Sequence, residues 1–285
     1  MRFVTFRRAG SHPEAGVVRG GEVMSLSGAG FPDTLSVIRG GAKALAKVEN
    51  WRAKPPAGAA TPLESVRLMA PIPRPPKLIC VGLNYRDHAE ETKMPIPTVP
   101  TIFCKFSTAV VGPGDNIVLP RSSTRPDYEA EFAFVVSRGG RHIAAADWRS
   151  HVFGYTIVND VSARDYQMAT TQWLMGKTFD TFAPMGPYLT TADEIADPQD
   201  LGISLTLNGQ VMQSSNTRNL IFRIPELVAF LSSVFTLEPG DVVTTGTPAG
   251  VGFSKKPPRW LRAGDEVVVK IEGLGELRNP VVAEE

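Results

Sequence analysis

Three carboxylates in two neighbouring segments are the side chains of this sequence best suited to chemistry. Glu129 and Glu131 stand two apart where the apolar, β-forming run 130–136 begins, and Asp160 ends a second such run, 154–160. Alternate side chains of a strand share a face, so the two glutamates point the same way. Carboxylates held side by side next to apolar residues repel each other unless a cation neutralises them. The spacing therefore predicts a metal site formed by these three residues.

The ligand type indicates the kind of metal. Carboxylate oxygens suit a hard ion such as Mg²⁺ or Mn²⁺, and no Cys or His stands nearby to favour zinc. Asp127 falls on the same predicted face as the two glutamates. The alternative is an edge strand with a solvated acidic face, because Glu-x-Glu is a common tripeptide. Spacing alone leaves both interpretations open.

A candidate general base precedes these carboxylates. If residues 83–91 open a short helix, His88 and Glu91 are three apart and share one face of it. A carboxylate beside an imidazole orients the ring and raises its basicity, which suits activation of a water molecule. The alternative is an ordinary surface histidine on a polar helix.

Further polar residues follow Asp160. Arg164 and Gln167 lie three apart on a predicted helix over 162–171, where they would face the metal and hold a carboxylate or carbonyl of the substrate; the alternative is a surface pair. Lys177 stands among aromatic residues and would stabilise a developing enolate, or it extends its charge to solvent.

Two irregular segments complete the candidate site. The glycine-rich turn 244–252 lacks the lysine and the following helix of a phosphate-binding loop, which excludes a nucleotide site. Its small residues and the Thr247 hydroxyl group would let the backbone approach a ligand closely. The proline-containing segment 91–100 is either a lid that excludes water or a static loop.

Short strands dominate the elements that must position these residues. Residues 1–70 predict short strands and a helix over 34–46, and the clustered prolines at 71–76 mark a boundary to a catalytic domain over 71–285. The absence of a repeated strand–helix–strand pattern disfavours a Rossmann or barrel architecture. The predicted fold class is α+β and β-rich. Strands are expected at 2–6, 15–19, 22–25, 77–82, 116–119, 130–136, 156–158, 203–207, 242–245 and 266–271, and a second helix of this domain at 225–233.

Composition narrows the function classes. With 285 residues, of which 42% are hydrophobic and 21% charged, the chain has the composition of an ordinary globular protein with a real core. A net charge of +1 gives no electrostatic case for nucleic acid, and no apolar run is long enough to span a membrane. The two cysteines make a disulfide framework improbable on composition, and the N-terminus predicts a strand instead of a signal peptide. We therefore expect a cytoplasmic protein.

The order of the motifs resembles the fumarylacetoacetate hydrolase family. The resemblance covers about residues 70 to 282, and the first 70 residues look like the variable N-terminal domain that many bacterial members carry. It implies a mixed β-roll catalytic domain with a small N-terminal α/β domain, assembled as a homodimer. The segments that carry the resemblance are 81–88, 105–107, 110–114, 127–131, 159–167, 177–187 and 246–252.

The resemblance also implies a role for each candidate residue. The metal ligands fall on Glu129, Glu131 and Asp160, with Mg²⁺ or Mn²⁺ as the ion. The remaining implied positions are His88, Glu91 and Lys177 for catalysis, and Arg164, Gln167, Tyr85 and Thr247 for the substrate. Met175-Gly176 stands where many relatives carry Arg-Ala, a change that bears on substrate choice.

The activity that the resemblance implies is hydrolysis of a carbon–carbon bond in a ketonic substrate. A 2,4-dioxo acid such as an acylpyruvate or fumarylpyruvate would give pyruvate and a carboxylic acid, with His88 activating water and the enolate held by the metal and Lys177. The alternatives are decarboxylation of oxaloacetate-like acids and isomerisation of 2-hydroxy-dienedioates in aromatic catabolism. A binding protein that keeps the 2-oxo acid site without catalysis is a further alternative.

Overall fold

The computed structural model describes all 285 residues, and a 12-stranded sheet forms its frame. Strands run along this sheet in the order β4-β3-β2-β1-β14-β12-β11-β17-β6-β7, with β5 paired to β1 and β8 paired to β14. Their bounds are β1 Arg2–Arg7, β2 Glu14–Arg19, β3 Glu22–Ser25, β4 Ala60–Pro62, β5 Arg67–Met69, β6 Leu78–Gly82, β7 Thr101–Lys105, β8 Val110–Val111, β11 Ala130–Val136, β12 Val152–Asn159, β14 Ala183–Thr191 and β17 Val242–Thr244.

A five-stranded sheet packs against the first sheet, in the order β16-β15-β18-β19-β9. Its strands are β9 Ile117–Leu119, β15 Gly202–Leu207, β16 Gln210–Asn216, β18 Glu266–Ile271 and β19 Gly275–Ala283; a separate pair joins β10 Pro126–Asp127 to β13 Ser162–Ala163. The helices are α1 Thr34–Ala53, α2 Arg86–Thr92, α3 Arg164–Gln167, α4 Leu174–Lys177 and α5 Ile224–Val234. This α+β, β-rich architecture confirms the predicted fold class.

Strand β11 shows how the two layers share one core. All seven of its residues are buried. Successive side chains alternate, so Phe132 and Phe134 enter a cluster of 36 residues that the five-stranded sheet also lines. Ala133 and Val135 enter a second cluster, of 23 residues, on the opposite face. Glu131 therefore lies on the face of the second cluster.

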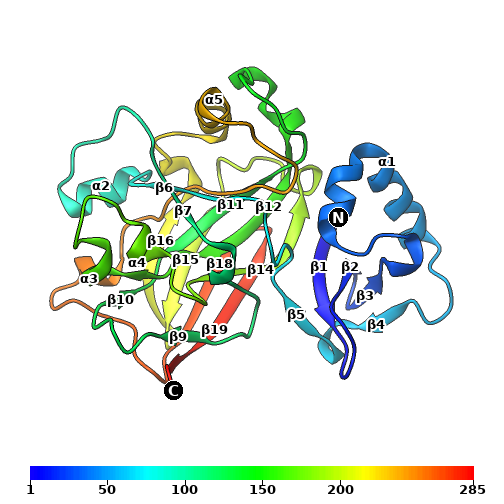
Figure 1. The fold of residues 1–285 in the computed structure, drawn as a ribbon, viewed down its shortest axis with the longest axis horizontal. Coiled ribbons are helices and arrows are strands. Elements are labelled where there is room, and N and C mark those ends of the chain that lie inside the picture. The colour runs from blue at the N-terminus through cyan, green and yellow to red at the C-terminus, as the bar shows by residue number, and fades with distance from the viewer.

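The N-terminal strands and α1 form a lobe beside the rest of the molecule (Figure 1). Its strand β1 pairs with β14, with Phe3 opposite Leu189, and the second core cluster contains residues from both parts of the chain. The two parts therefore share a sheet and a core. The division into domains 1–70 and 71–285 stays a prediction.

Most predicted elements are present, and the differences have local causes. α1 continues to Ala53, past a break at Gly41 (φ 58°, ψ −144°), so the predicted end at residue 46 was too early. The predicted helix over 162–171 was too long at both ends, because Ser162 pairs with Asp127 in a short strand and only Arg164–Gln167 is helical. β14 was missed because its two prolines and a glycine conceal its β pattern.

Candidate active site

The three carboxylates predicted to bind a metal lie together at one end of β11 and β12. These strands are antiparallel neighbours with Ala130 opposite Asn159, which places Glu129 across from Asp160, whose N–H donates to the Glu129 carbonyl (2.9 Å). Ligand oxygens of Glu129, Glu131 and Asp160 all lie within 4.8 Å of one another. Their exposed fractions are 5%, 1% and 0%. Strand pairing therefore builds a buried acidic trio from two segments of the chain.

Two buried lysines contact this trio. Lys177 Nζ lies 2.8 Å from Glu129 Oε2 and 2.8 Å from Asp160 Oδ2. Lys105 Nζ lies 2.5 Å from Asp160 Oδ1 and donates to the Val161 carbonyl (2.9 Å). The sequence prediction assigned no role to Lys105. Its position within one of the family-like segments, 105–107, was the only available signal.

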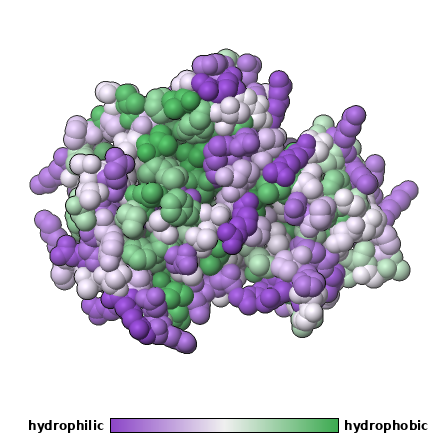
Figure 2. Space-filling model, viewed as in Figure 1, coloured by the Kyte–Doolittle hydropathy of each residue, from purple (hydrophilic) through white to green (hydrophobic).

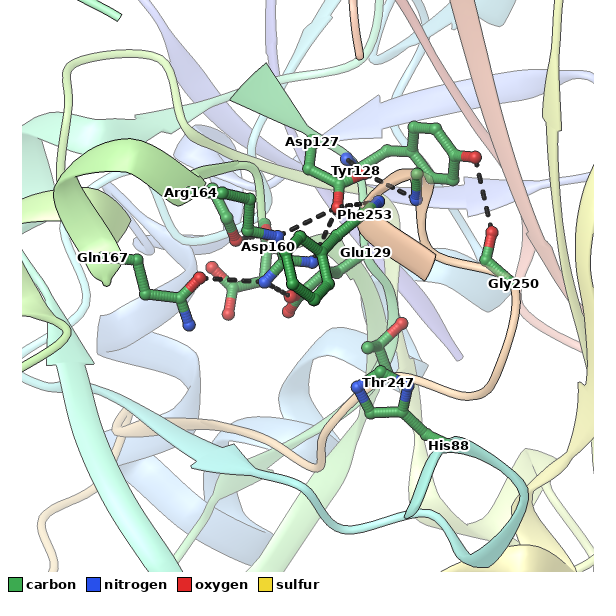
Figure 3. A network of polar contacts seen from close by, with 12 residues as sticks. His88, Asp127, Tyr128, Glu129, Asp160, Arg164, Gln167, Thr247, Gly250 and Phe253 are labelled. Atoms are coloured by element: carbon green, nitrogen blue, oxygen red, sulfur yellow. Dashed lines mark hydrogen bonds and ion pairs between the residues drawn. The ribbon is translucent and has the colours of Figure 1, made fainter. Parts of the chain in front are cut away.

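Arg164 closes the other side of Glu129. Its Nη1 lies 2.7 Å from Glu129 Oε1 and donates to Gln167 Oε1 (2.9 Å), while its Nε donates to Asp127 Oδ2 (2.9 Å; Figure 3). The predicted pairing of Arg164 with Gln167 beside the acidic trio is thus present in the structure. The short helix α3 is sufficient to place both side chains on the site.

Asp127 does not join the trio, although the strand pattern placed it on the same face. It is fully buried and accepts hydrogen bonds from the backbone N–H groups of Gly252 (2.8 Å) and Phe253 (3.0 Å). Together with its bonds to Arg164, these contacts connect the arginine to the glycine-rich turn. The physical reason for the difference is that the strand is interrupted between β10 and β11, so simple alternation does not extend to residue 127.

The pKa values of the two glutamates of the trio are shifted in opposite directions. Burial alone would raise the pKa of Glu129, but the positive charges of Lys177 and Arg164 lower this pKa to about 2. Burial and the nearby charges of Asp160 and Glu129 raise the pKa of Glu131 well above its ordinary value. Glu131 accepts a hydrogen bond from Gly246 N (2.9 Å) and takes part in none of the ion pairs. A buried carboxylate without a cationic partner, in an all-oxygen donor set, fits a hard divalent cation.

His88 and Glu91 lie on the short helix α2, as the spacing predicted. His88 Nδ1 is 3.4 Å from Glu91 Oε2, and Glu91 also accepts hydrogen bonds from Gly250 N at 3.1 and 3.0 Å. Burial raises the pKa of Glu91, but the contact with His88 and the hydrogen bond from Gly250 lower it more, so the net pKa lies below its ordinary value. Because Nδ1 faces Glu91, Nε2 is the ring nitrogen left for a substrate.

A cavity of about 230 Å³ joins these groups. The apolar wall of this cavity is formed by eight side chains: Val81, Leu83, Met94, Phe103, Met168, Trp173, Val251 and Phe253. The polar lining is His88, Thr92, Glu129, Glu131, Arg164, Gln167, Lys177 and Thr247, so two carboxylates of the trio line the cavity and Asp160 lies behind them. In Figure 3, His88 and Thr247 lie across from Arg164 and Glu129.

Of the predicted substrate-binding residues Thr247 and Tyr85, only Thr247 lines the cavity. The Thr247 hydroxyl group accepts a hydrogen bond from Gln213 Nε2 (2.8 Å), which leaves its own hydrogen for a ligand. Tyr85 lies outside the cavity lining and is fully buried, and its hydroxyl group has no hydrogen-bond partner. Its predicted role in substrate binding therefore lacks a contact in this structure.

Comparison with known proteins identifies the family of the chain. The family model described as "Fumarylacetoacetate (FAA) hydrolase C-terminal" matches residues 77–282. A human relative named "Oxaloacetate tautomerase FAHD2A, mitochondrial" is 44% identical over 289 residues, covering 99% of this chain and 92% of the relative. The Bos taurus relative of the same name is 51% identical over 223 residues, 78% of this chain and 71% of its own length.

The names of these relatives do not test the predicted cytoplasmic location of this chain. No helix of this chain is both long and apolar enough to cross a membrane. The names of these relatives place them in mitochondria, and a cytoplasmic location for this chain stays a prediction.

Solved structures resemble the whole chain. A maleylpyruvate hydrolase from Sphingobium sp. SYK-6, in complex with manganese(II) and pyruvate, is 32% identical with a TM-score of 0.85, and the match covers 100% of both chains. A putative HpcE protein from Mycobacterium smegmatis is 34% identical with a TM-score of 0.89, again over 100% of both. The chain belongs to the fumarylacetoacetate hydrolase family.

Proposed function

We propose that this protein is a metal-dependent tautomerase that interconverts the enol and keto forms of oxaloacetate. The observation that carries the proposal is the buried acidic trio beside Lys177, of which Glu129 and Glu131 line a small cavity together with His88. Such a site stabilises an enolate, which is the common intermediate of both forms. The whole-length similarity to a protein named oxaloacetate tautomerase supports the choice of substrate. Isomerisation of 2-hydroxy-dienedioates was one of the alternatives that the sequence left open. Tautomerisation is a proton transfer of the same kind, and we now prefer it to hydrolysis.

Glu129, Glu131 and Asp160 would hold Mg²⁺ or Mn²⁺. When bound, this cation supplies Lewis acidity that favours negative charge on the oxygen of the 2-oxo group. Lys177 adds a fixed positive charge: burial would lower its pKa, but Asp160 and Glu129 raise the pKa above its ordinary value, so the side chain stays protonated. Its ammonium group would donate a hydrogen bond to the enolate oxygen.

The arginine would orient the substrate. Arg164 lines the cavity, and its guanidinium group forms ion pairs with Asp127 (Nη2–Oδ2, 2.8 Å) and Glu129 (Nη1–Oε1, 2.7 Å). Held in this way, the guanidinium group would provide a fixed positive charge for a substrate carboxylate. Gln167, which also lines the cavity, keeps the guanidinium group in place through its Oε1.

His88 would move the proton at carbon 3. In the enol-to-keto direction, the enol hydroxyl group loses its proton and carbon 3 gains one, so no other reactant is needed. The Nε2–H of a protonated His88 would supply the proton at carbon 3, and the enol proton restores the imidazolium ion through solvent. Glu91 stabilises this imidazolium ion and orients the ring from its Nδ1 side.

The test follows the decay of enol absorbance in the ultraviolet when purified protein and Mg²⁺ or Mn²⁺ are added to oxaloacetate. We expect an acceleration that EDTA abolishes, without release of carbon dioxide. Release of carbon dioxide at the same rate would identify a decarboxylase instead. No acceleration over metal alone would refute the proposal.

Acylpyruvate hydrolysis is the second candidate. It is favoured by the whole-length structural similarity to a maleylpyruvate hydrolase with bound pyruvate, and by a His–Glu pair able to activate water. The same preparations, incubated with a panel of acylpyruvates, separate the two candidates. Metal-dependent release of pyruvate and a carboxylic acid would establish hydrolysis.

We further infer that the active form is a homodimer joined through the edge of β7. The outer edge of β7 is unpaired, and the neighbouring groove, of about 750 Å³, is lined by Pro75, Ile102, Phe106 and Phe235 among others. Hydrophobic side chains gather on this part of the face in Figure 2, and Phe106 is 54% exposed. A twofold axis lets such an edge meet its own copy. Light scattering should give a dimer for the wild type and a monomer for Phe106→Glu; a wild-type monomer would refute the inference.

A further inference from the structure

Gly176 lies where two short helices of the site meet. A Cβ atom at this position would lie 2.3 Å from Gln167 N, 2.6 Å from Gln167 Cα and 2.6 Å from the Ala163 carbonyl oxygen. All three are backbone atoms, so no side chain can move aside to make room. The φ angle of Gly176 is not in the left-handed region, and the glycine is therefore required by space alone.

The two helices carry the polar end of the cavity. α3 presents Arg164 and Gln167, and α4 presents Lys177. Arg164 and Lys177 contact opposite oxygens of the same carboxylate, Glu129, at 2.7 and 2.8 Å. The separation of the helix backbones thus sets the space between the guanidinium and ammonium groups that would hold the substrate.

α4 is also held from its other side. The ring of Trp173, the residue before α4, packs so closely on Gly82 that a Cβ atom there would lie 2.2 Å from the ring. Trp173 also packs against Phe103, with ring centroids 5.7 Å apart. α4 therefore has little freedom to retreat from α3, and any added atom at residue 176 must displace one of the two helices.

We propose that Gly176 is a specificity-determining positioning residue that restricts the polar end of the cavity to short 2-oxo acids. This inference rests on the proposed function and specifies the length of substrate that the site accepts. A methyl group at residue 176 needs about 1 Å of additional separation to reach ordinary van der Waals distance. That displacement moves Arg164 and Gln167 relative to Lys177, so a four-carbon substrate no longer reaches both while a longer one does.

The experiment compares wild type with Gly176→Ala on oxaloacetate and on acylpyruvates of increasing acyl length. A control variant accompanies it: Gly21→Ala, where an added Cβ meets no atom within 4 Å. We expect kcat/KM for oxaloacetate to fall about 10²-fold in Gly176→Ala, as for a misplacement of about 1 Å. The loss should shrink as the acyl group lengthens, Mn²⁺ affinity measured by calorimetry should stay unchanged, and the control should match wild type.

Two results would overturn the inference. One is an unchanged kcat/KM for oxaloacetate in folded Gly176→Ala, and the other is an equal loss on all substrates together with weaker Mn²⁺ binding, which indicates a merely structural role. If Gly176→Ala does not fold, adding Trp173→Phe gives α4 room to move toward Gly82, and this double variant is compared with Trp173→Phe alone.

Failure of the proposed function is separate, since it appears in the wild type as missing tautomerase activity. A wild type that acts only on acylpyruvates still allows the same comparison between short and long acyl groups.

Discussion

Glu129 and Glu131 of the acidic trio line the same cavity as His88 of the helix α2, but the trio and the helix are held very differently. The trio is nearly inaccessible, and the backbone pairing of β11 with β12 fixes its spacing. α2 has seven residues and no side-chain cap, and the side chains of His88 and Glu91 are 14% and 23% exposed. The segment that follows exposes Met94, Ile96 and Val99 by more than half.

This difference separates two parts of the chemistry. Enolate stabilisation depends on the rigid trio and Lys177, and it serves tautomerisation, hydrolysis and decarboxylation alike. The proton carrier sits on an element with fewer constraints, where the 3.4 Å distance between His88 and Glu91 leaves room to tighten around a substrate. The choice among these reactions therefore depends on α2 more than on the trio.

Removing a carboxylate of the trio should give the largest effect. Asp160→Ala leaves Lys105 and Lys177 without their shared partner, so we expect a loss of about 3–5 kcal/mol in the free energy of unfolding, and loss of Mn²⁺ binding. Urea denaturation and calorimetry measure the two effects. Glu276→Ala, which removes an exposed ion pair with Lys270, is the control and should change neither. Wild-type Mn²⁺ affinity in Asp160→Ala would contradict the ligand assignment.

Removing the imidazole should affect catalysis alone. His88→Ala should reduce the tautomerase rate roughly 10²–10⁴-fold, because a positioned acid–base group contributes that much. Mn²⁺ affinity and melting temperature should stay at wild-type values, since the partly exposed α2 contributes little to the trio. A parallel loss of metal binding would show that the two regions are not independent.

Lys177→Ala should reduce turnover about 10²-fold or more, because it removes a fixed charge at the enolate oxygen. The effect should be similar for oxaloacetate and for any acylpyruvate that is turned over, in contrast to His88→Ala, whose effect depends on the reaction. Steady-state rates on both substrates make the comparison. A near-wild-type rate would remove this lysine from the mechanism.

The smallest expected effect concerns the pH dependence of stability at Glu91. Its pKa is lowered from the ordinary value of 4.5 in the folded protein, so its hydrogen bonds stabilise the fold above that value and are lost as the pH falls through the folded pKa. Glu91→Gln should cost at most about 1 kcal/mol near neutral pH because the pair is partly solvated. The difference from wild type should shrink in acid, as measured by urea denaturation at several pH values. A difference that grows in acid would contradict the sign of the shift.

Local periodicity in the amino-acid sequence was sufficient to predict how several candidate side chains are arranged. The alternation of β11, the three-residue spacing of His88 and Glu91, and the strand that ends before Asp160 can each be read within a short window. These windows were enough to predict the β-rich class of the fold and several side chains that the structure brings together. They were not enough for the helix predicted over 162–171 or for the proline-containing strand β14.

Contacts between distant segments of the chain bring these elements together. The register of β11 against β12 brings Asp160 across from Glu129, and no local pattern encodes that pairing. Long-range contacts also make Lys105 a partner of Asp160, turn Asp127 toward Arg164, and bury Tyr85 away from the cavity. The physical reason is that side-chain direction follows from local backbone geometry, whereas ion pairs and close backbone approaches depend on atoms supplied by distant segments.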